Sequence, residues 1–375
     1  MGPLVSVVMA SYNHEGFVAP AIESVLRQRD VELELLVADD GSTDGSRGVV
    51  ASVRDDRLHF FPSDTNRGAC VVTNELIQRA SGEFIAVINS DDEWIGDDKL
   101  ARQRLFMESH PRIGACFGRV RFVDRGGRTI DKSALPYGRI FDQKNRSPGV
   151  WLRRFFDLGN CLCHPTMMIR RSCYDSVGMY DNRLRQLPDF DMWVRLLKRY
   201  DIHVSHTDMI AFRQLPGENA SAVTAVNSRR GVNELYFILR RFFDGISPEV
   251  LLDGFRDLLV HPDLVADDAH LDIELALLYG QAKGPASRIH NLVGLEKLHG
   301  LLGSDTHRPI LASEYGIDDR TFQAVTGEVG ALDDPVEALE KQLAYLNEAL
   351  HAFERSASWR VTAPLRRIRK VMRKP

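Results

Sequence analysis

The chain has 375 residues, of which 44% are hydrophobic and 27% charged, with a net charge of −4. These proportions are ordinary for a globular protein and exclude a collagen-like, a largely disordered or a disulfide-rich scaffold. The length favours two domains with an appendage, and no apolar run is long enough to predict a membrane-spanning helix.

Strand-like and helix-like segments alternate through the first 90 residues. Continuous apolar runs predict buried parallel strands, and apolar residues three or four apart predict helices. We expect strands at 4–10, 34–38, 58–61 and 84–88, and helices at 15–28, 44–53 and 69–80. Asp44 is expected to cap the second helix and Gly82 to end the third. This alternation predicts an α/β fold with a Rossmann-like, mostly parallel sheet and helices on both faces.

Polar clusters follow three of the predicted strands. Ser11–Asn13 follows the first strand, Asp39 and Asp40 follow the second, and Asp91 and Asp92 follow the fourth. Asp and Asn also form ordinary turns. However, the carboxyl ends of parallel strands meet at one edge of a sheet, where ligands bind. Three such clusters together favour a binding site at that edge.

The pattern is less regular beyond residue 110. We expect a β-hairpin at 115–130 with its turn at 125–128, a helix at 150–157, a strand at 166–169, an amphipathic helix at 189–200 and a strand at 209–212. Residues 227–302 have helical patterns without a chemical motif, so an α-helical C-terminal region should follow the sheet.

Two features mark the C-terminus. The first is a heptad of apolar residues: Val336, Leu339, Leu343, Leu346, Leu350 and Phe353. It predicts either a homodimer through 336–353 or a helix packed on its own domain. The second is the segment 355–375, which holds eight basic and no acidic residues, so the rest of the chain carries −12. This tail suits an anionic membrane surface or remains solvated, and the acidic body argues against a nucleic-acid partner.

The acidic pairs permit specific chemistry. Asp91 and Asp92 are adjacent, so their side chains point in different directions, which suits metal and ligand contacts better than a shared proton. Carboxylates favour Mg²⁺ or Mn²⁺, which bridge substrate phosphates. Asp39 and Asp40 can accept hydrogen bonds from ribose hydroxyls or a base edge. No Gly-x-Gly-x-x-Gly and no P-loop is present, which disfavours dinucleotide oxidoreductases and P-loop NTPases.

Several motifs occur in a particular order: Val5–Asn13, Val37–Ser46, Asn66–Gly68 with Asn74, Gly82–Ile85, Asn89–Trp94, His164–Arg171 and Pro188–Arg195. Over residues 3–220 this series resembles the family 2 glycosyltransferases, which have the GT-A fold and invert the anomeric configuration.

The resemblance implies roles for individual residues. It implies nucleotide-sugar binding by Ser11, Tyr12, Asn13, Glu15, Asp39, Asp40, Arg67, Asp91 and Arg213. It implies that Asp91 and Asp92 hold Mn²⁺ or Mg²⁺, and that Asp189 is the catalytic base. The pattern of the family departs at Asn89, which stands where the first acid of Asp-x-Asp is expected and puts metal dependence in question. Without the resemblance, Asp189 reads more simply as a helix N-cap.

We therefore expect an inverting glycosyltransferase that moves a sugar from a nucleoside-diphosphate sugar to a saccharide or lipid-linked acceptor. Asp189 would take the proton of the acceptor hydroxyl. A non-catalytic nucleotide- or carbohydrate-binding protein and a sugar nucleotidyltransferase are the alternatives. The expected organisation is a GT-A domain at 1–225, a helical region at 226–334, a heptad helix at 335–355 and a basic tail at 356–375.

The expected location follows from both ends of the chain. No basic region precedes an apolar one at the N-terminus, so we expect no secretory signal. Ser356–Arg366 resembles a tail of bacterial glycosyltransferases that assemble surface polysaccharides at the inner membrane. We expect a cytoplasmic protein, peripheral at the inner face of the plasma membrane.

Overall fold

The computed structural model describes residues 4–219, 222, 224–330 and 335–355. The chain forms two compact units, Met1–Gly316 and Ile317–Pro375. The second unit contains α13 (Asp319–Glu328) and α14 (Pro335–Arg355), and all the other elements belong to the first.

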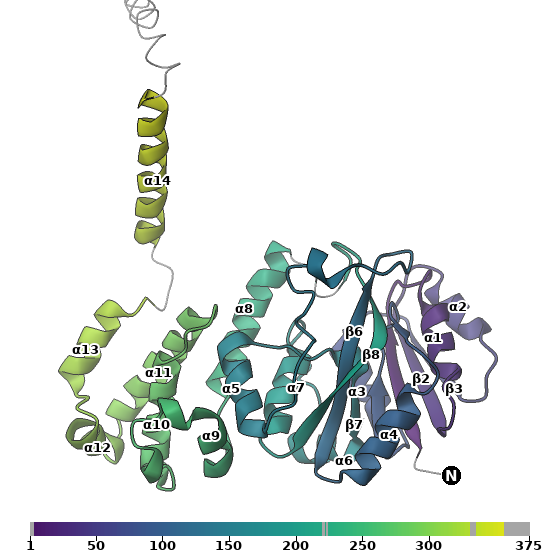
Figure 1. Ribbon diagram of the computed structural model, residues 1–375, viewed down its shortest axis with the longest axis horizontal. Coiled ribbons are helices and arrows are strands. Elements are labelled where there is room, and N and C mark those ends of the chain that lie inside the picture. The colour runs from purple at the N-terminus through teal and green to yellow at the C-terminus, as the bar shows by residue number, and fades with distance from the viewer. Residues whose placement is uncertain (1–3, 220–221, 223, 331–334, 356–375) are drawn as a thin grey trace, which may run out of the picture. The chain divides into compact units, whose positions relative to one another are not determined.

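A single mixed sheet organises the first unit (Figure 1). Its strands are β1 (Val5–Ser11), β2 (Leu33–Asp40), β3 (Leu58–Ser63), β4 (Phe84–Val87), β5 (Glu93–Trp94), β6 (Ile113–Val123), β7 (Met168–Arg170) and β8 (Asp201–Arg213). They lie in the order β3-β2-β1-β4-β7-β6-β8-β5. The first four in this order are mutually parallel, β6 is parallel to β8, and β7 and β5 run antiparallel to their neighbours. The predicted mostly parallel sheet is confirmed.

Helices cover both faces of this sheet. Those that flank the sheet are α1 (Val18–Leu26), α2 (Ser46–Ser52), α3 (Ala69–Arg79), α4 (Lys99–Ser109), α5 (Pro148–Leu158), α6 (Arg171–Val177) and α7 (Pro188–Leu197). The remaining helices of this unit are α8 (Ala225–Arg240), α9 (Pro248–Phe255), α10 (Asp268–Gly280), α11 (Ser287–Leu302) and α12 (His307–Glu314). Val7 and Met9 of β1 pack into one core with α1 and α4, whereas Val8 belongs to the opposite core with α3, α5 and α7. Strand side chains alternate between faces, so the continuous apolar run of β1 supplies both cores.

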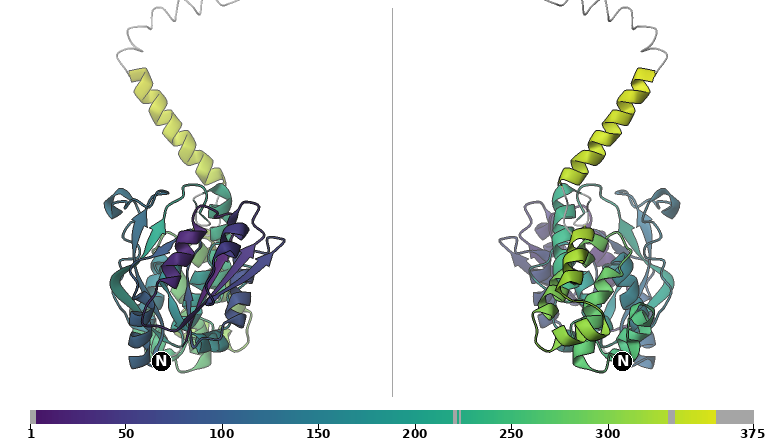
Figure 2. Two further views of the ribbon diagram at one scale, coloured as in Figure 1. Left: turned by 90° about the vertical axis from the view of Figure 1, so that its right-hand side faces the viewer. Right: turned by 90° about the vertical axis from the view of Figure 1, so that its left-hand side faces the viewer.

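Helices α8 to α12 of the predicted helical region lie on the side of the first unit away from β1–β3 (Figures 1 and 2). It shares the core beside α5, because the ring of Phe156 contacts those of Phe242, Phe255 and Tyr279. Gly254 of α9 lets this helix approach α5 closely, because a Cβ on Gly254 would collide with the backbone carbonyl of Gly149 in α5. None of the helices in the described ranges is long and apolar enough to cross a membrane.

The hairpin predicted for 115–130 is present only around its turn. The turn is present, because the Gly127 N–H donates to the Asp124 carbonyl at 3.0 Å, but the returning segment makes only an isolated bridge between Val123 and Thr129. β8 pairs with one edge of β6 along nearly its whole length, and the returning segment lies on the other edge, where the Ile130 N–H donates to the Phe122 carbonyl at 2.8 Å and the Asp124 N–H donates to the Arg128 carbonyl at 2.9 Å. The chain then forms a 3-10 turn at 132–134, so the return does not extend into a strand.

The two predicted helix caps also need correction. α3 ends before the extended Ala80, and Gly82 is needed for another reason: a Cβ there would lie 2.7 Å from the Leu4 carbonyl of the β1 approach. The N-cap of α2 is Gly45, and Asp44 just before it accepts the Ser46 N–H at 3.0 Å. Both sequence signals marked a helix boundary, but the capping position differs.

Candidate active site

The loops that follow β1 and β2 are hydrogen-bonded to each other at the carboxyl edge of the sheet. The Asn13 N–H donates to the Ser42 hydroxyl at 2.9 Å, and the Asn13 side-chain oxygen accepts the Thr43 N–H at 2.8 Å. The Gly45 N–H donates to the Glu15 carboxylate at 3.0 Å. Asn13 has φ 54°, a left-handed conformation that asparagine tolerates better than most residues. Asn13 and Glu15 therefore order this pair of loops.

Two buried polar atoms lie side by side beneath those loops. Ser11 and Asp39 are register partners on β1 and β2 and are 1% and 0% exposed. The Ser11 hydroxyl and Asp39 Oδ2 have no hydrogen-bond partner within the described part of the chain. Asp39 Oδ1 accepts the Ser42 N–H at 2.9 Å. Buried polar groups are normally paired, so these two atoms suit a ligand hydroxyl or N–H, next to the exposed ring of Tyr12.

Asp40 and Arg67 make protein contacts in this structure. Asp40 accepts the backbone N–H groups of Arg67 and Gly68 at 2.7 and 2.9 Å, and so fixes the loop before α3. The Arg67 guanidinium pairs with Glu75 of α3 at 2.5 Å. The Glu75 carboxylate raises the pKa of Arg67 through this pair. Nucleotide contact by either residue stays a prediction.

Asp91 and Asp92 sit in the turn after β4 and are almost fully buried. Asp92 accepts the backbone N–H of Arg213 at 2.8 Å and the side-chain amide of Asn89 at 2.9 Å, while Asp91 accepts the amide of Asn219 at 3.1 Å. Burial raises the pKa of both carboxyls, and the charge of Asp91 further raises that of Asp92. Burial therefore opposes the ionisation of both acids, and a bound cation would favour it.

Arg213 braces that turn. Its guanidinium donates to the carbonyls of Asp91 and Arg125 at 2.9 Å each and to the Glu93 carboxylate at 2.6 Å. It also lies over the Phe17 ring, 5.0 Å from the centroid. Contact with a diphosphate stays a prediction for Arg213, because its donors here hold the acidic turn to the end of β6.

The residues of this turn fit a hard divalent cation as a partial site. Oxygen ligands from one or two carboxylates, completed by water and substrate phosphates, are the usual protein contribution to Mg²⁺ or Mn²⁺ binding. The described residues contain no group of three or more His, Cys, Asp or Glu side chains placed to hold a metal. Asp92 is already hydrogen-bonded on both oxygens, so Asp91 is the better placed ligand of the two.

Asp189 is the second residue of α7, after Pro188. Its Oδ1 accepts the N–H of Phe190 and its Oδ2 accepts the side-chain amide of Asn160, each at 2.8 Å. Burial raises the pKa of Asp189 to about 6, against an ordinary 3.8, although these two donors lower it. The carboxyl satisfies an amide of the first helical turn, as a capping residue would, and still suits proton transfer near neutral pH.

The segment before β7 connects Asp189 with the acidic turn. Asn160 at its start donates to Asp189 at 2.8 Å, and the indole N–H of Trp94, two residues after Asp92, donates to the Pro165 carbonyl at 3.2 Å. Burial raises the pKa of the Cys163 thiol that lies in this segment. His164, the next residue, accepts or donates a hydrogen bond with the Tyr180 hydroxyl at 2.8 Å, and burial lowers its pKa to about 4. The segment 160–165 therefore contacts both Asp189 and the short strand that follows Asp92.

Several supporting residues were not predicted. Asn160 orients Asp189, Asn219 contacts Asp91, and His14 joins the loop after β1 to the acidic turn through Ser90 at 2.7 Å. Each acts on a partner far away in sequence. No local spacing pattern marks such pairs.

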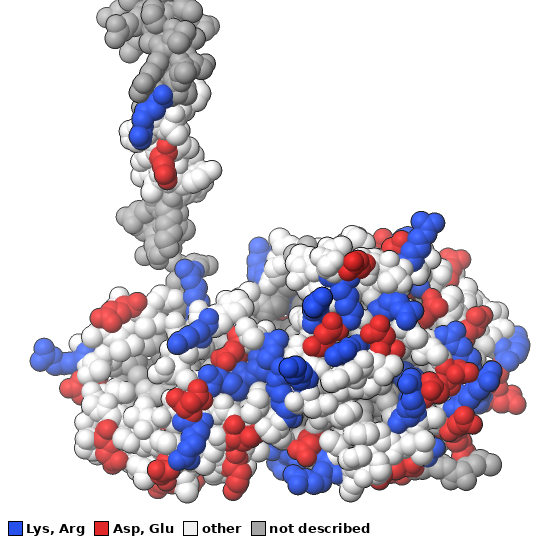
Figure 3. Space-filling view, viewed as in Figure 1, with Lys and Arg blue, Asp and Glu red and all other residues white. Residues whose placement is uncertain are grey.

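Charges of both signs are interspersed over the face of the first unit that Figure 3 shows. No broad field of a single sign is visible on this face. Its surface charge therefore gives no indication of a polyanionic partner on this side.

Comparison with known proteins places the chain in a family. Residues 6–177 match the model "Glycosyl transferase family 2". The putative glycosyltransferase EpsE of Bacillus subtilis is 31% identical over 52% of this chain and 68% of its own length. The putative teichuronic acid biosynthesis glycosyltransferase TuaG, also of B. subtilis, is 29% identical over 64% of this chain and 88% of its own. The Escherichia coli glucosyltransferase WfgD has the full description "UDP-Glc:alpha-D-GlcNAc-diphosphoundecaprenol beta-1,3-glucosyltransferase". It is 34% identical over 36% of this chain and 54% of its own length.

Solved structures share the fold. TarS of S. aureus in complex with UDP-GlcNAc has a TM-score of 0.52 and 17% identity, over 83% of this chain and 91% of that one. The mannosyltransferase PcManGT of Pyrobaculum calidifontis, in complex with GDP-Man and Mn²⁺, has a TM-score of 0.50 and 16% identity, over 88% of this chain and 87% of that one. The fold is thus GT-A-like. The chain belongs to glycosyl transferase family 2 and is a glycosyltransferase, which removes the binding-protein and nucleotidyltransferase alternatives.

Proposed function

We propose that the chain is an inverting glycosyltransferase that moves a sugar from a nucleoside-diphosphate sugar to a saccharide or lipid-linked acceptor in cell-surface polysaccharide synthesis. The observation that carries this proposal is the buried carboxylate of Asp189, which Asn160 holds at one end of a segment whose other end contacts Trp94, two residues after Asp92. Burial raises the pKa of Asp189 to about 6. A single displacement needs a base and an acidic, cation-binding edge at one place, and these residues supply both.

The donor nucleoside is proposed to lie over the ends of β1 and β2. The unpaired oxygen of Asp39 can accept a hydrogen bond from a ribose hydroxyl or a base N–H, and the Ser11 hydroxyl can donate one or accept one. The loops ordered by Asn13 and Glu15 would form the rim, with Tyr12 available for stacking on a base. Asp40 would act through the loop that it fixes before α3.

The acidic turn after β4 is proposed to hold the cation. Asp91 would be the main protein ligand, and Asp92 would keep the turn in shape through its hydrogen bonds to Asn89 and Arg213. When bound, Mn²⁺ or Mg²⁺ supplies Lewis-acid stabilisation of the leaving nucleoside diphosphate. Arg213 would maintain the geometry of the turn and contribute positive charge close to it.

Asp189 is proposed to remove the acceptor proton. As the acceptor oxygen forms its bond to the anomeric carbon, the O–H proton passes to the Asp189 carboxylate. The bond from that carbon to the diphosphate oxygen breaks at the same time. One displacement from the opposite face inverts the anomeric configuration. Asn160 and the Phe190 N–H hold the carboxylate in a fixed orientation for this transfer.

The acceptor class rests on the relatives. WfgD is named for an acceptor with a sugar on diphosphoundecaprenol, and TuaG for teichuronic acid biosynthesis. A lipid-linked acceptor requires the enzyme to work at a membrane surface. Peripheral binding of the inner leaflet by the basic tail is proposed accordingly, and residues 356–375 lie outside the described part of the structure.

Dimerisation through α14 is also proposed. Its heptad residues are more than half exposed: Leu339, Leu343, Leu346, Leu350 and Phe353. A row of exposed apolar side chains at heptad spacing is typical of a helix that pairs with another.

A donor screen followed by one variant tests the proposed function. Thermal shifts would be measured with UDP-glucose, UDP-GlcNAc and GDP-mannose, each with Mn²⁺ or Mg²⁺. The donor that binds would then be assayed with a synthetic GlcNAc-diphospholipid and for hydrolysis. Asp189→Asn should retain donor binding and lose 10²–10⁴-fold of turnover, on the order that removal of a general base produces. Full turnover of this variant would refute the proposed base.

A further inference from the structure

Glu234, on α8 of the helical region, binds the segment that leads into α7. It is 5% exposed. Its carboxylate accepts three consecutive backbone N–H groups: Arg185 at 2.9 Å, Gln186 at 2.8 Å and Leu187 at 2.9 Å. Consecutive amides that converge on one anion form a nest, an arrangement that normally binds a carboxylate or phosphate tightly. Here the anion belongs to a distant element of the same chain.

This nest ends where α7 begins. Leu187 is the N-cap residue of α7 and provides no side-chain cap, and Asp189 follows two residues later. Pro188 between them has no N–H, so it cannot anchor this turn by donating a hydrogen bond. The Glu234 carboxylate therefore fixes the backbone immediately before the proposed base, and its negative charge is also favourable near a helix N-terminus.

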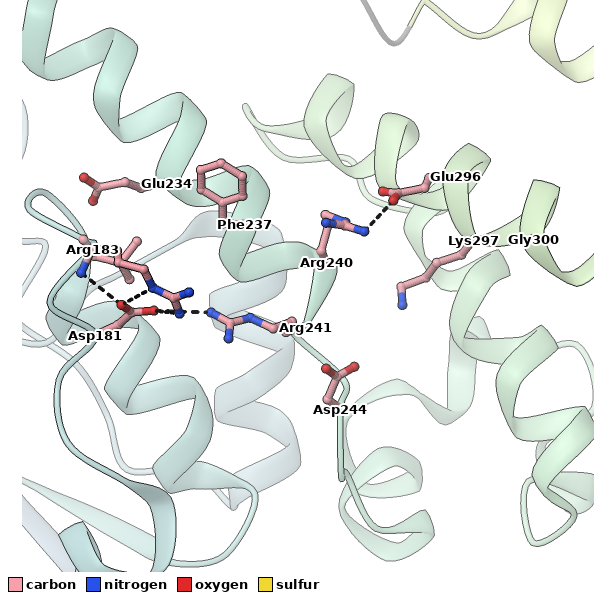
Figure 4. A pocket seen from close by; sticks show the side chains of 11 residues that line it. Asp181, Arg183, Glu234, Phe237, Arg240, Arg241, Asp244, Glu296, Lys297 and Gly300 are labelled. Atoms are coloured by element: carbon pink, nitrogen blue, oxygen red, sulfur yellow. Dashed lines mark hydrogen bonds and ion pairs between the residues drawn. The ribbon is translucent and has the colours of Figure 1, made fainter.

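Figure 4 shows where Glu234 lies. It belongs to the lining of a cavity of about 740 Å³ between α8, α11 and the segment 181–184. Its side chain extends toward the segment that carries Asp181 and Arg183. The last amide that Glu234 binds, the Leu187 N–H, lies two residues before Asp189 in the chain.

We propose that Glu234 is a positioning residue for Asp189: the helical region sets the catalytic carboxylate by clamping the backbone at 185–187. This inference rests on the proposed function, because it assumes that Asp189 is the base. It assigns a task in catalysis to the helical region, which carries no chemical motif of its own. Displacement of a reacting group by about 1 Å can reduce a rate on the order of 10²-fold.

Glu234→Gln is the appropriate change, because it keeps the shape of the side chain. One of the two acceptor oxygens becomes an NH₂ group, which faces backbone N–H donors and cannot accept from them. The nest then loses at least one hydrogen bond and its compensating charge. Residues 185–187 should shift, and Asp189 should move with them.

The chain offers a matched control in Glu274 of α10. Glu274 is equally buried, at 1% exposed, and accepts the backbone N–H groups of Val260 and His261 at 2.8 and 2.6 Å. Its other partner is the hydroxyl of Tyr315. Glu274→Gln therefore removes the same kind of clamp from a loop that does not lead to Asp189.

Both variants would be studied as the full chain with UDP-glucose, UDP-GlcNAc and GDP-mannose plus Mn²⁺. We expect Glu234→Gln to lower kcat about 10–100-fold with nucleotide affinity unchanged within about twofold. The acidic limb of its pH–rate profile should shift, since the surroundings of Asp189 change. Backbone amides at 185–187 should exchange hydrogen faster. Glu274→Gln should lose comparable thermal stability and keep kcat and the pH profile.

A kcat within twofold of wild type in Glu234→Gln overturns the inference, and so does an equal loss in both variants. If Asp189→Asn is fully active, the proposed function fails, and the hydrogen exchange of 185–187 still decides whether Glu234 clamps that segment. If Asp189→Asn is inactive and Glu234→Gln is normal, only the positioning role fails.

Discussion

Asp189→Asn should make the protein less active and, at neutral pH, more stable. The folded-state pKa of Asp189 is about 6, above the value of 3.8 expected for the unfolded chain. The folded state therefore binds more protons between these two values, and its stability falls as pH rises from about 4 to about 6. An uncharged asparagine does not experience this loss.

The size of the effect follows from the contacts. The difference between a pKa of about 6 and the ordinary 3.8 corresponds to about 3 kcal/mol, which partial exposure of the Asp189 side chain reduces to about 2 kcal/mol. Asparagine keeps one acceptor for the Phe190 N–H and the Asn160 amide, so one hydrogen bond worth about 1 kcal/mol is lost. The net gain at pH 7.5 should be about 1 kcal/mol.

Asp181→Asn is a control that should lower the stability at neutral pH, where Asp189→Asn should raise it. The Arg183 guanidinium lowers the pKa of Asp181 to about 2, so this carboxylate stabilises the fold above the unfolded pKa and loses that contribution as pH falls. Because Arg183 is largely exposed, the loss at pH 7.5 should be about 1 kcal/mol. Glycosyl transfer should be unaffected by the charge change itself.

Urea unfolding at pH 4.5 and 7.5 measures both variants. The free energy of unfolding of Asp189→Asn, relative to that of wild type, should rise by about 1–2 kcal/mol from pH 4.5 to pH 7.5. Wild-type turnover should fall about tenfold from pH 7 to pH 5, as the ionised fraction of a base with this pKa falls from about 90% to about 10%. A variant that is less stable than wild type at pH 7.5, or a wild-type rate independent of pH, would refute the reasoning.

Four further outcomes are expected. Asp91→Asn should weaken Mn²⁺-linked nucleotide binding at least tenfold and leave metal-free binding unchanged, as calorimetry would measure. Asn89→Asp places a carboxylate against Asp92 and should lower the free energy of unfolding by about 1–3 kcal/mol, with recovery on adding Mn²⁺ and nucleotide. Leu343→Lys should convert a dimer to a monomer in light scattering; a dimer that persists contradicts the α14 interface. Deleting 356–375 should abolish sedimentation with anionic vesicles, and equal sedimentation of the truncated chain would contradict membrane binding by the tail.

The part of the fold that could be predicted is the part with uniform burial. Strands β1, β2 and β4 are covered on both faces, so their apolar runs reveal them directly. Strand β8 runs Asp201–Arg213, but only 209–212 was predicted, because its first half has only two apolar residues, Ile202 and Val204, among polar ones. The hairpin at 115–130 is limited to its turn, because turn residues mark a reversal of the chain and do not say how far the returning segment pairs.

Some residues of the candidate site could likewise be predicted from the sequence, and others could not. Ser11, Asp39 and Asp92 could be located because each ends a predicted strand, and parallel strand ends meet at one edge. The partners of these residues could not be predicted. Asn160 and Glu234 act on atoms far away in sequence, through pairings that only the packed helices create.

Asn89 illustrates how the acidic turn tolerates its departure from the family pattern. Asp91 and Asp92 are already buried together, and each raises the free energy of charging the turn. A third carboxylate at position 89 would add repulsion, whereas the Asn89 amide donates a hydrogen bond to Asp92 and favours its charged form. The backbone N–H of Arg213 does the same from the other side. Two buried acids with these donors therefore need less compensation by the proposed cation than three acids would.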